Sequence, residues 1–179
     1  MKDYMKQSSR ILCLSAETRI NTPSGVNRID FIEPGMDILG YDALSGVCIA
    51  DSVGKIARSF HNRCAIVVFD NGSILKLTVD HPLFVQGKGW CVVCLNEERC
   101  TYGVSVDKLN VGDVCVFYLD GEIAQTEVVS IEIKTCSEDF YCFSTNKSHS
   151  FFANGVLVRD VDIDSIPQEQ LIANQVVVK

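Results

Sequence analysis

Two segments of this sequence carry the residue types of a site that uses a cysteine as nucleophile. Cys13 stands near the N-terminus, and Thr78 and His81 form a Thr-x-x-His step. An imidazole can donate a proton to a leaving amine or polarise a carbonyl, which makes it the usual partner of a nucleophilic thiol. The hydroxyl of Thr78, three residues before His81, can be presented to the same amine or carbonyl on which the imidazole acts. In the alternative interpretation, His81 only caps the turn before Pro82, and Cys13 is a buried structural thiol.

An internal repeat gives a second histidine a matching place. The stretch 32–39 (IEPGMDIL) resembles 109–116 (LNVGDVCV), and each is followed by a tyrosine, an aspartate and a glycine turn. Further along, the same steps from His to Phe to Gly occur twice, at His81, Phe84 and Gly87 and at His149, Phe152 and Gly155. Two related β units that share a core are the simplest explanation of the repeat.

The pattern between the turns is that of an all-β protein. Runs rich in Val, Ile, Phe and Thr alternate with turn sequences such as Asn71-Gly72, Asp120-Gly121 and Asn154-Gly155. The expected strands are 19–21, 36–42, 52–60, 64–69, 74–78, 83–86, 114–119, 127–134, 141–144, 150–153 and 156–158. A short helix is expected over 166–174, with Ser165 as its cap and Pro167 in its first turn.

Composition excludes several classes of protein. With 179 residues, a net charge of −7 and 47% hydrophobic residues, the chain predicts one folded domain with a short appendage and no basic face for nucleic acid. Its apolar runs are too short to span a membrane, and MKDYMKQSSRIL lacks the apolar core of a secretory signal. A cytoplasmic location is therefore expected, in which the nine cysteines are thiols, ligands or nucleophiles and not a disulfide framework.

Three ordered blocks resemble the Hint domains shared by Hedgehog autoprocessing regions, inteins and bacterial intein-like elements. The resemblance covers about residues 13 to 160 and rests on CLS at 13–15 with the stretch around Gly35, on TVDHPL at 78–83 with LNVGD at 109–113, and on FYCF at 140–143 with His149 and NGVLV at 154–158. It implies an all-β Hint fold of two pseudo-symmetric β units, with Cys13 near the centre and the module's two ends close together. Residues 1–12 and 161–179 would be the flanks, and 91–106 an insertion.

The resemblance also implies a chemistry for these residues. Cys13 would attack the carbonyl of Leu12 and convert the peptide bond to a thioester by an N-to-S acyl shift, with Thr78 and His81 activating the bond. Cys142 stands where many relatives have an assisting aspartate; it is interpreted either as a proton relay or acyl acceptor, or as a thiol that fills space. His149 resembles the histidine that supports the C-terminal step. This chemistry requires no metal and no organic cofactor.

The C-terminal end departs from the splicing pattern. Splicing relatives end in His-Asn followed by Cys, Ser or Thr, whereas this module ends in Arg159-Asp160-Val161. Arginine stays protonated and is a poor proton donor, aspartate cyclises less readily than asparagine, and valine offers no nucleophile. Full splicing is therefore not expected. The prediction is self-cleavage at Leu12–Cys13 by thioester hydrolysis or by an outside water, thiol or amine.

Three alternatives remain open at this point. The module can be a degenerate Hint unit that serves only interaction or structure, or a cysteine hydrolase that acts on other proteins. The spacing of Cys91, Cys94 and Cys100 resembles part of a zinc knuckle, but the fourth ligand and the hinge glycines are missing locally. A surface hairpin is the favoured interpretation of this insertion.

Overall fold

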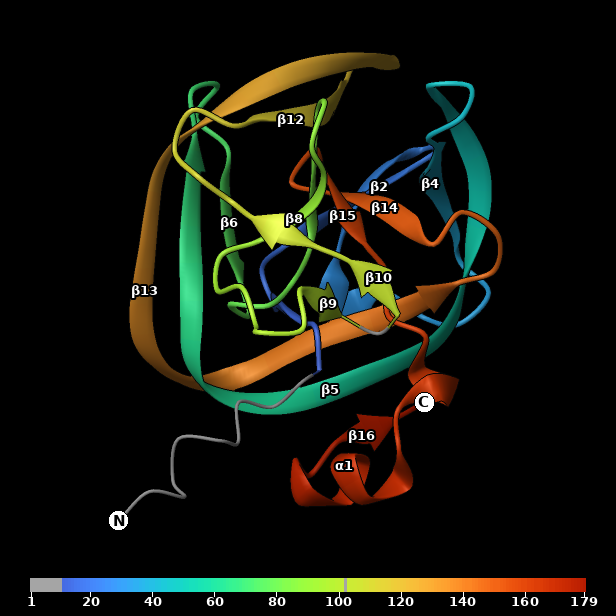
Figure 1. The fold of residues 1–179 in the computed structure, drawn as a ribbon. Coiled ribbons are helices and arrows are strands. Elements are labelled where there is room, and N and C mark those ends of the chain that lie inside the picture. The colour runs from blue at the N-terminus through green and yellow to red at the C-terminus, as the bar shows by residue number, and fades with distance from the viewer. Residues whose placement is uncertain (1–10, 102) are drawn as a thin grey trace.

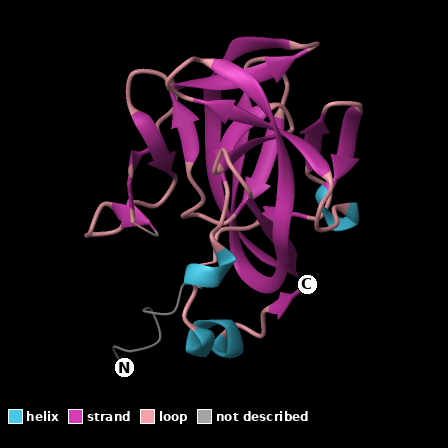
Figure 2. Cartoon of the chain, turned by 90° about the vertical axis from the view of Figure 1, so that its right-hand side faces the viewer, coloured by secondary structure: helices cyan, strands magenta, loops and turns pink. Residues whose placement is uncertain are grey.

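The computed structural model describes residues 11–101 and 103–179. Residues 1–10, the larger part of the predicted N-terminal flank, lie outside the described part. The chain is built almost entirely of β-strands, which confirms the all-β prediction, and its helical elements gather at one end of the molecule and on one side of it (Figure 2). Among the described residues, no helix has the length and apolar character needed to cross a membrane. The strands are β1 (Leu14–Ser15), β2 (Arg19–Thr22), β3 (Gly25–Arg28), β4 (Asp37–Asp42), β5 (Val47–Phe69), β6 (Ile74–Leu77), β7 (Leu83–Val85), β8 (Gly89–Val92), β9 (Cys100–Thr101), β10 (Val104–Ser105), β11 (Asp107–Lys108), β12 (Val114–Leu119), β13 (Glu122–Thr145), β14 (Ser150–Ala153), β15 (Val156–Arg159) and β16 (Val177–Val178).

Two long strands, β5 and β13, form an antiparallel ribbon that curves around the rest of the molecule (Figure 1). The sequence predicted two separate strands in place of each, and this was wrong. The polar stretch 61–63 between the expected strands stays in the ladder, where Arg63 pairs with Thr135 and His61 with Glu138. The register shifts between Thr135 and Glu138, and such a bulge bends a ribbon without ending it.

Main-chain hydrogen bonds confirm the internal repeat. Gly35 (φ 86°) donates its N–H to the carbonyl of Val53, and Gly112 (φ 93°) donates to the carbonyl of Val128, both at 2.8 Å. In each half the long-strand residue donates back at 2.9 Å to the residue after the glycine. The turns that precede β4 and β12 are therefore held against the long strands β5 and β13 with the same geometry, which a glycine in the left-handed region permits.

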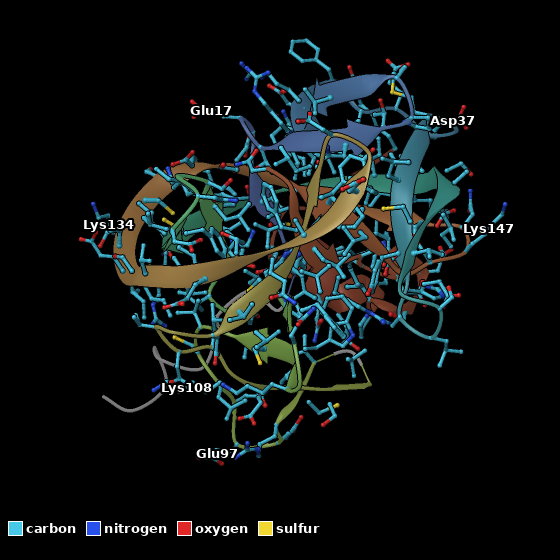
Figure 3. All side chains as sticks on the ribbon, turned by 90° about the horizontal axis from the view of Figure 1, so that it is seen from above. Glu17, Asp37, Glu97, Lys108, Lys134 and Lys147 are labelled. Carbon is cyan, nitrogen blue, oxygen red and sulfur yellow. The ribbon has the colours of Figure 1, made fainter. Side chains whose placement is uncertain are left out.

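Alternation of side chains along the strands separates core from surface. In β6, Leu75 and Leu77 are fully buried, whereas Ile74, which precedes them on the opposite face of the strand, is exposed. The mirrored aromatic residues of the repeat, Phe84 and Phe152, both pack against Tyr41 with ring centroids 6.3 Å apart. Charged side chains of both signs lie around the rim of the molecule, as Figure 3 shows for Glu17, Asp37, Glu97, Lys108, Lys134 and Lys147.

The C-terminal segment folds against this body. A 3-10 turn (Ile163–Ser165) leads to the helix α1 (Gln168–Ala173) and then to β16, which pairs with β5. The expected helix exists but is shorter than predicted, and Ser165 is not its cap. The Ser165 hydroxyl donates to the carbonyl of Asp162 at 2.8 Å, and Pro167 is the residue that precedes the first helical position.

The Asn154-Gly155 turn lets us test how the second unit is packed. Asn154 (φ 48°) and Gly155 (φ 83°) have the left-handed conformation of the tight hairpin that their sequence predicts. A Cβ on Gly155 would lie 2.3 Å from Cε2 of Phe117, whereas a Cβ on Gly72, with a similar φ of 86°, would meet nothing within 4 Å.

We expect Gly155→Ala to lower the free energy of unfolding by about 1–3 kcal/mol more than Gly72→Ala does, because both substitutions strain the backbone and only the first adds a clash. Urea denaturation of the two variants measures this difference. Equal losses would contradict the packing of Phe117 against the turn.

Candidate functional site

Cys13 is brought to the site by the two-residue strand β1. This strand lies between β6 and β13, with Leu14 paired to Leu77 on one side and to Tyr141 on the other. The pairing places Cys13 beside Thr78, whose N–H donates to the Cys13 carbonyl at 3.0 Å. In return, the Cys13 N–H donates to Oγ1 of Thr78 at 3.2 Å. The nitrogen of the Leu12–Cys13 peptide therefore faces the threonine hydroxyl in a fully buried position.

His81 is fixed beside the same peptide by a turn and by its ring. Its N–H donates to the carbonyl of Thr78 at 3.1 Å, and Nε2 lies 3.1 Å from the carbonyl oxygen of Arg159. Because a carbonyl only accepts, we assign the ring proton to Nε2, which leaves a lone pair on Nδ1. Nδ1 is buried and has no hydrogen bond within residues 11–101 and 103–179. Burial lowers the pKa of His81 to about 4, although main-chain groups of Arg159 and Cys13 act in the opposite direction.

The thiol of Cys13 lies in surroundings that disfavour its ionisation. Burial raises the pKa of Cys13 well above its ordinary value, and hydrogen bonding to Cys142, the charge of that group and the carboxylate of Asp80 raise it further. Cys142 lies on β13 opposite Ala57 and is buried. At neutral pH, Cys13 is therefore a protonated thiol, and nucleophilic attack needs a base within the site.

His149 and Asp160 form a second group, at the C-terminal end of the module. Nδ1 of His149 lies 3.6 Å from Oδ2 of Asp160. The same carboxylate oxygen accepts from the N–H of Thr145 at 2.8 Å and from its hydroxyl at 2.9 Å. His149 has a φ of 54° and receives the Asp160 N–H on its carbonyl at 3.1 Å. Asp160 is buried and held in place by these contacts.

Arg159 connects the two groups. Its carbonyl accepts from His81, as described above, and its guanidinium lies over the ring of Trp90 at 5.6 Å. Asp160, the next residue, belongs to the second group. The structure thus places Cys13, Thr78, His81 and Cys142 together, and His149 and Asp160 together, with one peptide unit between the two groups.

The cysteines of the 91–106 stretch are dispersed. Cys91 lies in β8 with its thiol directed to the carbonyl of Gly89 at 3.6 Å, and Cys94 lies 3.6 Å from the guanidinium of Arg63. Cys100 belongs to β9, which pairs with β10 in a separate two-stranded sheet. Among the residues that the structure describes, no three His, Cys, Asp or Glu side chains are placed to hold a metal ion together.

Sequence reasoning missed three contributors to the site. Asp80 stands inside the TVDH block, and its proximity to Cys13 could have been suspected from that position. Thr145, which holds Asp160, carries no signal in the sequence. Arg159 contributes its main-chain carbonyl, which no side-chain pattern can reveal.

Solved structures of inteins share this architecture. The DnaB intein from Synechocystis sp. PCC 6803 superposes with a TM-score of 0.70 at 17% identity, covering 84% of this chain and 99% of that one. A bacterial intein-like domain from Clostridium thermocellum gives a TM-score of 0.67 at 22% identity, covering 83% of this chain and 98% of that one. The gp41-1 intein gives 0.61 at 18% identity, with coverages of 84% and 99%. The chain has the Hint fold that the sequence predicted.

Comparison of the sequence with known families and proteins finds a shorter match than comparison of the structures does. The model of the Ataxin-1 and HBP1 module (AXH) matches residues 53–119, which is less than half of the chain. None of the curated proteins matches the sequence significantly.

The buried neutral state of His81 makes stability depend on pH. The pKa of His81 is about 4 in the folded chain against an ordinary value of 6.5, so the unfolded chain takes up the proton first as the pH falls. The free energy of unfolding should therefore decrease from pH 6.5 toward pH 4, by up to about 3 kcal/mol from this residue.

We expect His81→Gln to lose less stability than the unaltered chain over that range. His61, whose pKa burial also lowers to about 4, is present in both proteins and cancels in the comparison. Urea denaturation at pH 7.5 and at pH 4.5 measures the difference, and identical losses would contradict a buried neutral His81.

Proposed function

We propose that this chain, which has the Hint fold, is an autoprocessing domain that cleaves itself at Leu12–Cys13 through a thioester. The observation that carries the proposal is the position of the buried Cys13 N–H, which donates a hydrogen bond to Oγ1 of Thr78 and lies beside the neutral ring of His81. Each partner is fixed by main-chain hydrogen bonds before any reaction begins. Such preorganisation is what an uphill acyl shift requires of a site.

The groups of the site can carry out the first step by passing a single proton among themselves. The Cys13 thiol passes its proton to Nδ1 of His81, and Sγ attacks the Leu12 carbonyl to give a tetrahedral oxyanion. Nδ1 then returns the proton to the Cys13 nitrogen, the C–N bond breaks, and the carbonyl re-forms as a thioester with a free amine. No proton enters or leaves the site, which suits a thiol and an imidazole that are both buried and uncharged.

Thr78 and Cys142 act on this step in different ways. The Thr78 oxygen accepts from the Cys13 N–H, so it adds electron density to the nitrogen that must take up the proton. Cys142 is in hydrogen-bonding range of the Cys13 thiol and raises its pKa, which keeps the proton in the site until His81 takes it. The second step is attack on the thioester by water or by an outside thiol or amine.

We propose no splicing and no reaction at the C-terminal junction. The Asp160 carboxylate would have to attack its own main-chain carbonyl, but Thr145 holds one of its oxygens by two hydrogen bonds. Val161, the residue after it, has no nucleophile. We propose that His149 and Asp160 have a structural role, in which their contact holds the end of strand β15 against the rest of the module.

The decisive experiment is intact-mass analysis of the full chain. Cleavage releases residues 1–12, and a strong thiol such as 2-mercaptoethanesulfonate should speed the release and leave that peptide as its own thioester. Cys13→Ala should keep its full mass, whereas Cys48→Ala, which removes a thiol outside the site, should cleave as the unaltered chain does.

A full-length mass that stays unchanged for days in thiol would contradict self-cleavage. It would favour the second candidate, a Hint module that serves only as an interaction or structural unit. The raised pKa of the Cys13 thiol is the observation that favours this candidate.

The contribution of Thr78 can be measured separately. Thr78→Val keeps the shape of the side chain and removes the acceptor for the Cys13 N–H, so we expect thiol-induced cleavage to slow by about ten- to a hundredfold. Thr126→Val is the matched control, because Thr126 is equally buried but bonds Asp70 outside the site. Equal rates in the two variants would rule out a role for Thr78.

A further inference from the structure

We propose that residues 161–179 complete the binding site for the segment that precedes the junction. They form an apolar subsite that holds Ile11 and Leu12, selects apolar residues at these two positions and keeps water from the Leu12 carbonyl. The inference rests on the proposed function, because Leu12 is the acyl residue of the thioester. It adds a specificity determinant outside the 13–160 region.

The first observation is the complete burial of two residues upstream of the nucleophile. Ile11 is 0% exposed and Leu12 is 1% exposed, although both precede the first strand of the module. They share a cluster separate from the main core, and its members come from two sources. The module provides Cys13, Ala57, Cys64, Phe140 and Cys142, and the C-terminal flank provides Val161, Ile163 and Ile166, with Leu171 and Val176 packed against the cluster.

The second observation is that the C-terminal flank is fastened at both ends. At its start, the Val161 N–H donates to the carbonyl of Phe143 at 3.2 Å. At its end, Lys179 and Ile56 exchange two main-chain hydrogen bonds of 2.8 and 3.1 Å, which extend the pairing of β16 with β5. Between these points, the Lys55 ammonium forms an ion pair with Asp164. Figure 1 shows α1 and β16 beneath β5, outside the main β body.

The chemistry of this cluster determines what it accepts. The residues that the flank contributes to this cluster are all aliphatic. A charged or amide side chain at position 11 or 12 would be desolvated there without a partner from the flank, which costs free energy. Apolar side chains gain free energy from the same burial. The subsite therefore favours acyl segments that end in two apolar residues.

Exclusion of water follows from the same arrangement. A thioester at Leu12–Cys13 would remain covered by the flank after it forms, because Cys13 belongs to the same buried cluster. Attack by water or by an outside nucleophile then requires the flank to move. The flank thus controls how long the thioester lives as well as which residue forms it.

Neighbouring residues of α1 provide a matched pair of variants. Leu171 packs against the cluster, whereas Ile172 is 68% exposed. Leu171→Ser and Ile172→Ser lose similar apolar side chains from the same six-residue helix. Their effects on the helix itself are therefore similar, and only the first removes a wall of the subsite.

The first measurement is amide hydrogen exchange of the full chain in a Cys13→Ala background, followed by mass spectrometry. This readout needs no cleavage. We expect exchange over residues 11–14 to be at least about tenfold faster in Leu171→Ser than in Ile172→Ser, with β12 unchanged in both as the internal reference. Equal exchange over 11–14 in the two variants would overturn the inference.

The second measurement separates this inference from the proposed function. With Cys13 present, Leu171→Ser should raise the share of water-hydrolysed product several-fold, and Ile172→Ser should not. If no variant cleaves but the exchange rates differ as expected, the proposed function fails and the subsite stands. If the chain cleaves and both hydrolysis and exchange are the same in the two variants, the subsite fails and the proposed function stands.

Discussion

The site depends on one short interaction, the insertion of β1 between β6 and β13. Leu14 pairs with Leu77 on one side and with Tyr141 on the other, Ser15 pairs with Phe140, and through this pairing the peptide before Cys13 is held in the interior. Buried backbone groups must find hydrogen-bond partners. Here the Cys13 N–H finds a side chain, Oγ1 of Thr78, in place of a main-chain carbonyl. The proposed site of reaction is therefore a position at which a hydroxyl accepts the main-chain hydrogen bond of the reacting peptide nitrogen.

Burial at this position sets the protonation of Cys13 and His81. It raises the pKa of Cys13 and lowers that of His81, so both partners are uncharged at neutral pH. A thiolate and imidazolium pair would have a large desolvation cost in such surroundings. Proton transfer inside the site is therefore more favourable than exchange of protons with solvent. The same burial explains why the segment before Cys13 needs an apolar cover and why the C-terminal flank, which lies outside the module, can provide it.

The sequence predicted the fold and the repeat, and it named Cys13 with its neighbours and His149 with Asp160, but it did not predict the long strands or the contact of Thr145 with Asp160. The sequence predicts the Asn-Gly and Asp-Gly turns and the equivalent glycines of the repeat, because their conformation depends on the residue types at the turn itself. No local sequence signal predicts that β5 and β13 continue through polar residues, because each strand is held by its pairing with the other along the ribbon. Thr145 likewise meets Asp160 only through the fold. The hydrogen bond between His81 and the carbonyl of Arg159 could not be predicted from the sequence, because every residue has a main-chain carbonyl.

The C-terminal residues that depart from the splicing pattern can be understood from the site they now serve. Arg159 has no imidazole for a C-terminal step, yet its carbonyl fixes the tautomer of His81, and its guanidinium on Trp90 holds that main chain in place. Asp160 bonds Thr145 and lies beside His149, so the strand that carries Arg159 is anchored one residue further on. The same two residues can therefore lack the groups needed for a C-terminal reaction and still support the proposed reaction at Leu12–Cys13. A module that keeps its C-terminal flank can use that flank as structure, and residues 161–179 share a buried apolar cluster with residues 11 and 12, where the proposed subsite lies.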